Sequence, residues 1–415
     1  MQIVHIGLSG EPKPFHALAS AQELMETHQH CSELVVFLDK FWDNNIQDFA
    51  GEITKFVNVI SRTKPAWRIF VLANSSDTHA QQQLHDTGAH DVLFVDFFLY
   101  RVYREVVIHK KCSIKNTVGT DTRKNKFLFL TGKVSKSNRI RLLKKLVDAG
   151  VMTKAEWSFF YYDHQVERNQ RSRAWLPELS DQEFDEFVHT WINNPDNAII
   201  AVTLKDLEYG GIPYNVKLYT DTDFSLISET FFSEGTTISP WITEKTWIPI
   251  LNQQPFIMAG DVGTLATLRS MGFETYEAWY KDPNLDNINN RESRLDALVS
   301  TVQHWLENDF TQQQKIVAVH NAKVMYELYY KNLAKILEFI EKHQLPLTID
   351  DVIPTHGRHD DYDPEKAKNK LFLNFYNNIK DTAWPECYSL SDFYKLPQEI
   401  QTECIETFGF IPPVN

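Results

Sequence analysis

Residues 241–272, WITEKTWIPILNQQPFIMAGDVGTLATLRSMG, contain the pattern that decides the fold of the second half of the chain. Thr243 is a typical helix N-cap, and the residues after it predict a short helix over 243–252, which a proline soon ends. The apolar residues 256–259 predict a buried strand, and residues 264–270 predict a second helix. A helix, a buried strand and another helix in this order indicate an α/β domain.

The start of the first helix in this stretch carries chemistry as well as structure. The first turn of a helix presents backbone N–H groups and the positive end of the helix dipole, which favour anions. Lys245 adds a full positive charge there, and the neighbouring Glu244 can accept hydrogen bonds from sugar or ribose hydroxyls. These groups suit a diphosphate attached to a sugar, although an ordinary solvated helix start would carry the same two residues.

Several segments in a fixed order resemble one family of transferases. TEKTWIPILNQQPFIMAG, followed by GTLATLRSMGFETYEAWY, resembles the nucleotide-sugar-binding half of the α-1,3-fucosyltransferase type, in the form common in phage and bacterial glycosyltransferase-like proteins. The similarity covers about residues 125–330 and implies a GT-B-like fold with two Rossmann-like domains. Its other elements are FSLISETFF at 224–232, FLFLTGKVSKSNRIRLLKKL at 127–146, Arg294, His320 and Asn321.

Length and composition limit the number of domains, the role of the cysteines and the cellular location. A chain of 415 residues fits two or three domains. Its four cysteines form no CxxC pair, so they read as reduced thiols and indicate neither a zinc knuckle nor a disulfide framework. There is no signal-peptide pattern, and no apolar run reaches the roughly 18 residues of a membrane span. We therefore expect no membrane association and a cytoplasmic location, and the resemblance to phage and bacterial proteins implies a bacterium or a phage-infected host.

Residues 1–110 alternate strands and helices and predict a separate α/β domain. VVFLDKF places Asp39 at the end of a strand, where a response-regulator receiver has its phospho-acceptor. The first strand, however, ends in GLSGEP without a pair of acids, and Asp96 stands where the usual lysine would be. We therefore predict a degenerate receiver-like or flavodoxin-like domain. Its expected strands are 3–8, 34–39, 67–73 and 91–95, and its expected helices are 15–28, 46–61, 78–88 and 97–109.

A polar, basic linker is expected at 111–124, followed by the nucleotide-sugar domain at 125–344 and a mainly helical extension at 345–415. Within the domain, a strand at 125–130 leads to a helix at 139–149. Arg139 and Arg141 lie in the first turn of that helix, where a cation opposes the helix dipole unless an anion sits between them. The resemblance implies that Arg139 binds phosphate, and Lys133 is a further candidate. Further strands are expected at 157–162, 198–202 and 218–228, and helices at 181–194 and over most of 291–344.

Two other features of the sequence leave alternatives open. Glu229 ends the strand at 218–228 and could hold ribose hydroxyls, or it could pair with Lys245 as a structural partner. The acidic loop HGRHDDYDPE contains His356 and His359 without a metal-ligand spacing, so no metal site is predicted. No organic cofactor is expected beyond the nucleotide sugar itself.

Charge is unevenly distributed along the chain. Residues 101–145 contain 14 Lys and Arg against two acids, a local charge of +12 in a chain whose net charge is −13. Such a band attracts polyanions, although a linker and a solvated helix face would also explain it.

The sequence therefore predicts a glycosyltransferase that moves a hexose or pentose from a nucleotide diphosphate sugar to an acceptor hydroxyl, with inversion and without a metal. We expect Arg139, Lys245 and Glu244 to serve catalysis, with Lys133, Glu229 and Thr243 helping to bind the donor. Arg139 and Lys245 are both expected at exposed helix starts. The acceptor could be a glycan, a small molecule or DNA with hydroxymethylated bases. A non-catalytic scaffold built from degenerate domains is the alternative outside enzymes.

Overall fold

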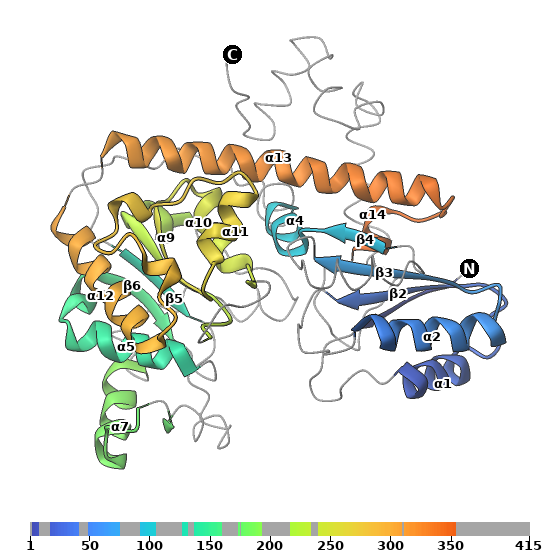
Figure 1. Ribbon diagram of the computed structural model, residues 1–415, viewed down its shortest axis with the longest axis horizontal. Helices are drawn as coiled ribbons and strands as arrows, with labels where there is room; N and C mark the ends of the chain where they lie inside the picture. The colour runs from blue at the N-terminus through green and yellow to red at the C-terminus, as the bar shows by residue number, and fades with distance from the viewer. Residues whose placement is uncertain are drawn as a thin grey trace, which may run out of the picture. The chain divides into compact units, whose positions relative to one another are not determined.

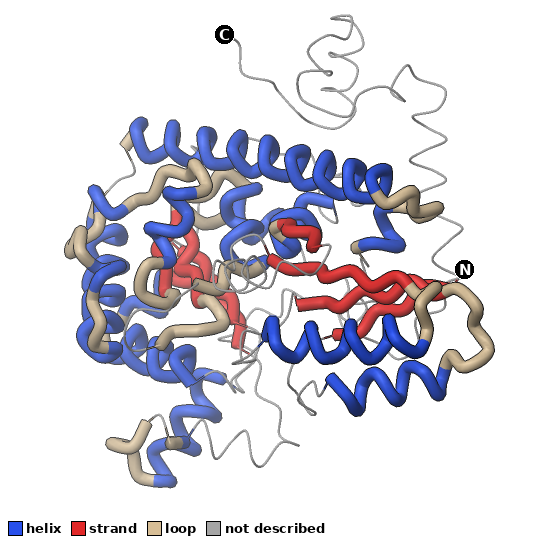
Figure 2. Tube along the Cα trace, turned by 45° about the vertical axis from the view of Figure 1, so that its right-hand side comes forward, coloured by secondary structure: helices blue, strands red, loops and turns tan. Residues whose placement is uncertain are grey.

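The computed structural model describes residues 2–7, 17–40, 49–74, 92–104, 127–131, 137–159, 173–174, 176–192, 216–233, 240–308 and 311–353. In these ranges the chain divides into two compact units. The first includes Met1–Arg101 and Tyr329–Thr355, and the second includes Val102–Leu328. Each contains a parallel four-stranded sheet with helices packed against it (Figures 1 and 2). The predicted α/β class is therefore confirmed.

The sheet of the first unit has the strand order β1-β2-β3-β4. Receiver and flavodoxin-like domains instead have the order 2-1-3-4-5, in which β1 lies between β2 and β3. Here β2 is hydrogen-bonded to β1 on one side and to β3 on the other. The receiver-like topology predicted for residues 1–110 is therefore not the one observed. The strands are β1 Gln2–Gly7, β2 Leu34–Lys40, β3 Arg68–Asn74 and β4 Val92–Val95.

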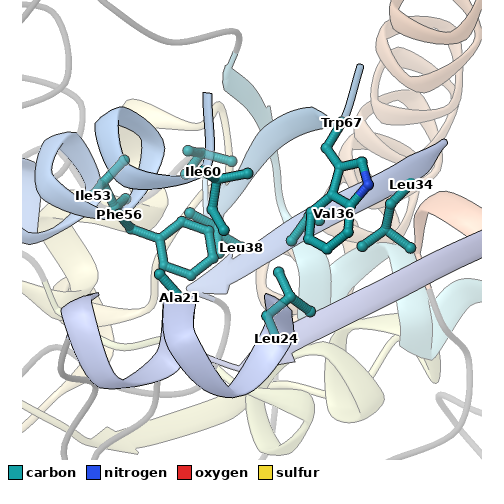
Figure 3. Close-up of a cluster of buried hydrophobic side chains, with 10 residues drawn as sticks. Ala21, Leu24, Leu34, Val36, Leu38, Ile53, Phe56, Ile60 and Trp67 are labelled. Atoms are coloured by element: carbon teal, nitrogen blue, oxygen red, sulfur yellow. The ribbon is translucent and has the colours of Figure 1, made fainter. Parts of the chain in front are cut away.

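Both faces of β2 are covered, which explains its unbroken apolar sequence. On one face, Val36 and Leu38 join a buried cluster with helices α1 (Ala17–Thr27) and α2 (Phe49–Thr63) (Figure 3). On the other face, the ring centroid of Phe37 lies 5.7 Å from that of Phe70, which in turn lies 5.1 Å from that of Phe339. The cluster consists of Ala21, Leu24, Leu34, Val36, Leu38, Ile53, Phe56, Ile60, Trp67 and Val71.

Phe339 belongs to the long helix α13, Gln312–Lys342, which contributes to both units. From Tyr329 onward the helix belongs to the first unit, where the ring of Tyr329 stacks on that of Tyr100 at a centroid distance of 5.2 Å. The boundary expected at residue 344 thus differs from the observed division. The reason is that the aromatic face of α13 packs against the first sheet, so residues 329–353 belong to that unit together with α14 (Ile349–Val352).

His5 gives the first unit an expected pH dependence. Its Nε2 lies 2.8 Å from the carbonyl oxygen of Asp351, while its Nδ1 is buried with no hydrogen-bond partner among the described residues. Burial lowers the pKa of the His5 ring, and the hydrogen bond to Asp351 offsets only part of that effect. Because the unfolded chain binds this proton more readily, His5 should reduce stability as the pH falls below about 6.5, by at most about 1.4 kcal/mol per pH unit.

The measurement is chemical unfolding of the wild type and of His5→Phe between neutral and mildly acidic pH. Phenylalanine keeps the stacking on Phe37 but cannot titrate, so its stability should fall less steeply with decreasing pH. Equal slopes for the two proteins would contradict this role of His5.

The sheet of the second unit has the strand order β6-β5-β7-β8, and all its pairings are parallel. The chain first adds β6 on one side of β5 and then adds β7 and β8 on the other side, so the order reverses between β5 and β7. Such a reversal is the topological switch point of a doubly wound sheet. The strands are β5 Phe127–Thr131, β6 Ala155–Phe159, β7 Phe224–Ser228 and β8 Phe256–Ala259.

The helices of this unit cover the two faces of its sheet. Right-handed crossovers place α5 (Ser137–Asp148) and α10 (Glu244–Leu251) on opposite faces, because they connect strands on opposite sides of the switch point. Helix α12 (Arg291–Glu307) packs beside α5 (Figure 1). The remaining helical segments are Val151–Lys154, α7 Asp181–Phe187, a π-helix at Val188–Ile192, α9 Val216–Thr220, α11 Thr264–Ser270, Glu277–Trp279 and Leu285–Asn287.

Helix α10 ends in a Schellman motif, which turns the chain into β8. The amide of Gln254 donates to the carbonyl of Pro249 at 3.0 Å, and the amide of Gln253 donates to that of Ile250 at 3.0 Å. Gln253 takes the left-handed conformation that this motif requires, with φ of 52°. The predicted strand at 256–259 and helix at 264–270 are confirmed.

One predicted strand is partly wrong. The strand expected over 218–228 begins only at Phe224, because Val216–Thr220 forms helix α9. Thr222 stabilises the end of that helix by donating from Oγ1 to the carbonyl of Leu218 at 2.8 Å. None of the helices in the described ranges carries an apolar segment of membrane-spanning length. The elements expected at 78–88 and 198–202, and the tail beyond 353, lie outside the described residues.

Candidate functional site

The carboxyl ends of β5 and β7 flank the switch point of the second sheet, where open α/β sheets bind ligands. The ladder between these two strands covers only the first two residues of each. At their far ends, Arg139 of α5 reaches across to β7. Its Nη2 lies 3.4 Å from the carbonyl oxygen of Ser228 and 3.5 Å from that of Glu229, which are long contacts for hydrogen bonds. The guanidinium of Arg139 therefore lies at the switch point of the second sheet.

Arg139 is buried, with 3% of its surface exposed, so the expectation of an exposed helix start is wrong for this residue. The helix geometry explains the burial: Leu142 and Leu146 follow at spacings of three and seven, on the same buried face. Burial lowers the pKa of Arg139, and the charges of Glu229 and Glu244 oppose this shift. An arginine remains protonated under such conditions, so the site contains a buried positive charge.

Glu229 is 1% exposed, and its carboxylate is satisfied from within the protein. Its Oε1 accepts from the amide of Thr243 at 3.0 Å and from Oγ1 of Thr246 at 2.5 Å. Its Oε2 accepts from Oγ1 of Thr243 at 2.6 Å and from the amide of Thr230 at 3.2 Å. A carboxylate has about four acceptor positions, so little capacity is left for a ribose. The geometry gives Glu229 neither expected role: it anchors the start of α10 instead of binding a ribose or pairing with Lys245.

Lys245 and Glu244 lie in the first turn of α10, next to that anchor. The Nζ of Lys245 is 2.6 Å from Oε1 of Glu244 and 3.1 Å from Oγ1 of Thr243. The side chains of Lys245 and Glu244 are 21% and 32% exposed. A partly exposed ion pair contributes little free energy. Lys245 and Glu244 can therefore separate and each bind a ligand at a small cost in free energy. Thr243 is the N-cap, as predicted, and accepts from the amide of Lys245 at 3.5 Å.

Arg141 is not part of this site, although the sequence places it beside Arg139. Its guanidinium forms ion pairs with Glu178 and, at 3.1 Å, with Glu292 of α12. Lys145, one turn further along α5, pairs with Asp296 at 2.5 Å. These ion pairs join α5 to α12 and explain why Arg141 and Lys145 are positively charged residues. The structure therefore gives no reason to place a bound anion next to Arg141.

In the segment that follows β7, both the amide and the carbonyl of Ser233 form hydrogen bonds with side chains. The amide of Ser233 donates to Oδ1 of Asp261 at 2.6 Å, and its carbonyl accepts from Nη2 of Arg294 at 2.6 Å. The guanidinium of Arg294 also lies 4.1 Å from the ring centroid of Phe232. Arg294 belongs to the pattern of resemblance, and its observed contacts position the chain next to Glu229.

His320 and Asn321 also belong to that pattern, and the sequence offered no chemistry for them. The side chain of Asn321 donates to the carbonyl of Glu274 at 2.8 Å and accepts from its amide at 2.8 Å. Nε2 of His320 lies 3.1 Å from the carbonyl oxygen of Gly272. The pair therefore fixes the turn after α11, which is a role in positioning the backbone.

Lys133, His356 and His359 lie outside the described residues, and the structure does not describe the side chain of Asp39. Within the part of the chain that is described, no group of three or more His, Cys, Asp or Glu side chains is arranged to hold a metal ion.

No protein-family model matches this chain, and no curated protein sequence matches it significantly. Among solved structures, the trehalose-6-phosphate phosphatase N-terminal domain from Candida albicans is similar, with 9% sequence identity and a TM-score of 0.42. The alignment covers 78% of this chain and 74% of that one. A similarity this weak says nothing about the chemistry of this chain.

Proposed function

We propose that this chain is a glycosyltransferase that moves a sugar from a nucleotide diphosphate sugar to an acceptor hydroxyl. The proposal includes a GT-B-like pair of domains, with the donor on the second unit, and an inverting route that needs no metal. The observation that carries it is the position of Arg139 at the switch point of the second sheet. Arg139 is close enough to Glu244 for the negative charge of that residue to act on its pKa. Lys245 adjoins Glu244 at the start of α10.

The chemistry of sugar transfer assigns a role to each of these groups. The diphosphate leaving group gains negative charge in the transition state, and fixed cations stabilise that charge. Arg139 supplies a buried cation, and Lys245 supplies one that can leave its surface pair. Glu244 can then accept hydrogen bonds from hydroxyls of the donor. The base that takes the acceptor proton is not among these residues.

The described residues weaken the case for DNA as the acceptor. Six of the 14 basic residues in 101–145 are described. Arg101, Arg104 and Arg139 are buried, while Arg141, Lys144 and Lys145 pair with carboxylates. None of these six offers an unpaired surface charge to a phosphate backbone, and on that ground we propose a glycan or small-molecule acceptor over DNA.

The first test is a thermal-shift panel with UDP-, GDP-, ADP- and dTDP-sugars. A ligand at about 100 times its dissociation constant stabilises a protein by about 2.7 kcal/mol, which for a unit of this size raises the Tm by roughly 5–10 °C. We expect such a rise with sugars of one nucleotide and much smaller rises with the others. The best donor is then used to screen acceptors for sugar incorporation. If no nucleotide sugar raises the Tm, the proposed function is wrong and the scaffold alternative is favoured.

A further inference from the structure

The buried hydroxyl of Ser228 lacks a hydrogen-bond partner among the described residues. Ser228 is the last residue of β7 and is 1% exposed, and its Oγ has no hydrogen-bond partner among the described residues. Ser225, at the other end of the same strand, is also buried but donates from Oγ to the side chain of Gln254. Buried hydroxyls are normally satisfied, so an unsatisfied one at a ligand-binding edge indicates a missing partner.

The pleat of β7 shows which way this hydroxyl faces. Successive side chains of a strand point to opposite faces of the sheet. Glu229 directs its carboxylate to Thr243 and Thr246, on the side of α10. The side chain of Ser228 therefore points to the other face, which α5 covers, and the guanidinium of Arg139 reaches from α5 to the carbonyl of Ser228.

The two helix starts at this edge differ in whether they can accept an anion. The start of α10 already has one, because the carboxylate of Glu229 accepts from the amide and the hydroxyl of its N-cap Thr243. A phosphate seated on the amides of 243–245 would be repelled by this buried negative charge. Helix α5 has 12 residues, and Arg139 near its start reaches the carbonyl oxygen of Ser228. A helix start of this kind favours an anion, and the arginine strengthens the attraction.

We propose that Ser228 is a phosphate-binding residue, donating a hydrogen bond from Oγ to a phosphate group that also contacts Arg139 and the start of α5. This inference rests on the proposed function, in which the phosphate belongs to the diphosphate of the donor, and it moves the phosphate away from the amides of 243–245. Lys245, which is partly exposed, then contacts the ligand from the side of α10. A free phosphate or pyrophosphate has the same chemistry and would bind the same groups.

The test is calorimetric titration of the full-length wild type, Ser228→Ala and Ser225→Ala. The ligands are inorganic phosphate, pyrophosphate and the nucleoside diphosphates UDP, GDP, ADP and dTDP. Ser228→Ala should weaken the binding of pyrophosphate or of the preferred nucleoside diphosphate by about tenfold or more, as expected for a lost hydrogen bond to a charged group. Its Tm without ligand should equal or exceed that of the wild type, since an unpaired buried hydroxyl is removed. Ser225→Ala should do the reverse, with a lower Tm and unchanged affinity.

The other outcomes bear on this inference, on the proposed function, or on both. Wild-type affinity in Ser228→Ala, together with nucleotide binding that depends on Lys245, would overturn the role of Ser228 and leave the proposed function standing. Pyrophosphate binding that Ser228→Ala weakens, without any gain from an attached nucleoside, would support the site and overturn the nucleotide-sugar donor. Absence of binding by the wild type would overturn both. A Ser228→Ala protein that does not fold would show that the hydroxyl has a structural partner, which overturns the inference.

Discussion

Glu229→Ala is expected to lower the free energy of unfolding of the second unit by roughly 3–5 kcal/mol, equivalent to a fall in Tm on the order of 10 °C. The carboxylate accepts four hydrogen bonds, and the alanine variant leaves their donors on Thr230, Thr243 and Thr246 unsatisfied in a buried place. Because three of those four bonds fix the start of α10, the same change should also disturb the turn that carries Glu244 and Lys245.

The matched control for that change is Glu244→Ala, which removes the same chemical group 15 positions away in sequence, at the start of the same helix. The side chain of Glu244 is 32% exposed and pairs with Lys245, so its loss should change stability by no more than about 1 kcal/mol. Chemical unfolding of both variants gives the comparison. Similar losses for the two glutamates would show that Glu229 does not anchor α10.

Much of the secondary structure of the second unit could be predicted because its boundaries are set by local chemistry. Thr243 caps α10, and Gly260 and Gly272 stand beside β8 and α11, so the predicted limits agree with the observed ones. The run before Glu229 had no such marker. An apolar segment of this length is compatible with one strand, and equally with a short helix followed by a strand. Contacts of Gln254 with Tyr219 and Thr222 help to fix the α9 segment, but Gln254 is remote from them in the sequence.

The strand orders could not be read from the sequence, and they changed the interpretation of both units. Alternating strands and helices predict a parallel sheet, but they do not say on which side of β1 the next strand is added. The chain adds the strands of the first unit in one direction, and it reverses direction in the second. The switch point that locates the candidate site is therefore a property of tertiary structure, although the sequence alone predicts Arg139 as a candidate residue beside it.

The sequence did contain a signal for the burial of Arg139 that the prediction of an exposed helix start passed over. Arg139, Leu142, Leu143 and Leu146 share one helical stripe, whereas Arg141 lies off it and pairs with acids on the surface. For Glu229 no signal existed, since its partners Thr243 and Thr246 are 14 and 17 residues away. The burial of Arg139 also has a practical consequence: Arg139→Ala would mix a loss of catalysis with a loss of folding, so Lys245 is the cleaner test of the site.

Lys245→Ala is expected to lower the rate of sugar transfer by about 100-fold or more with little effect on folding. A charge-assisted contact to phosphate contributes roughly 1.5–3 kcal/mol to binding, and it contributes more where charge develops in the transition state. The matched control is Lys144→Ala. Its side chain is 19% exposed and pairs with Asp148 at 2.5 Å, against 21% and 2.6 Å for Lys245 and Glu244. Both variants should therefore keep a Tm close to that of the wild type, and only Lys245→Ala should lose transfer with the preferred donor. Wild-type turnover in Lys245→Ala would remove this lysine from the site, and equal losses in the two variants would point to a general effect of charge.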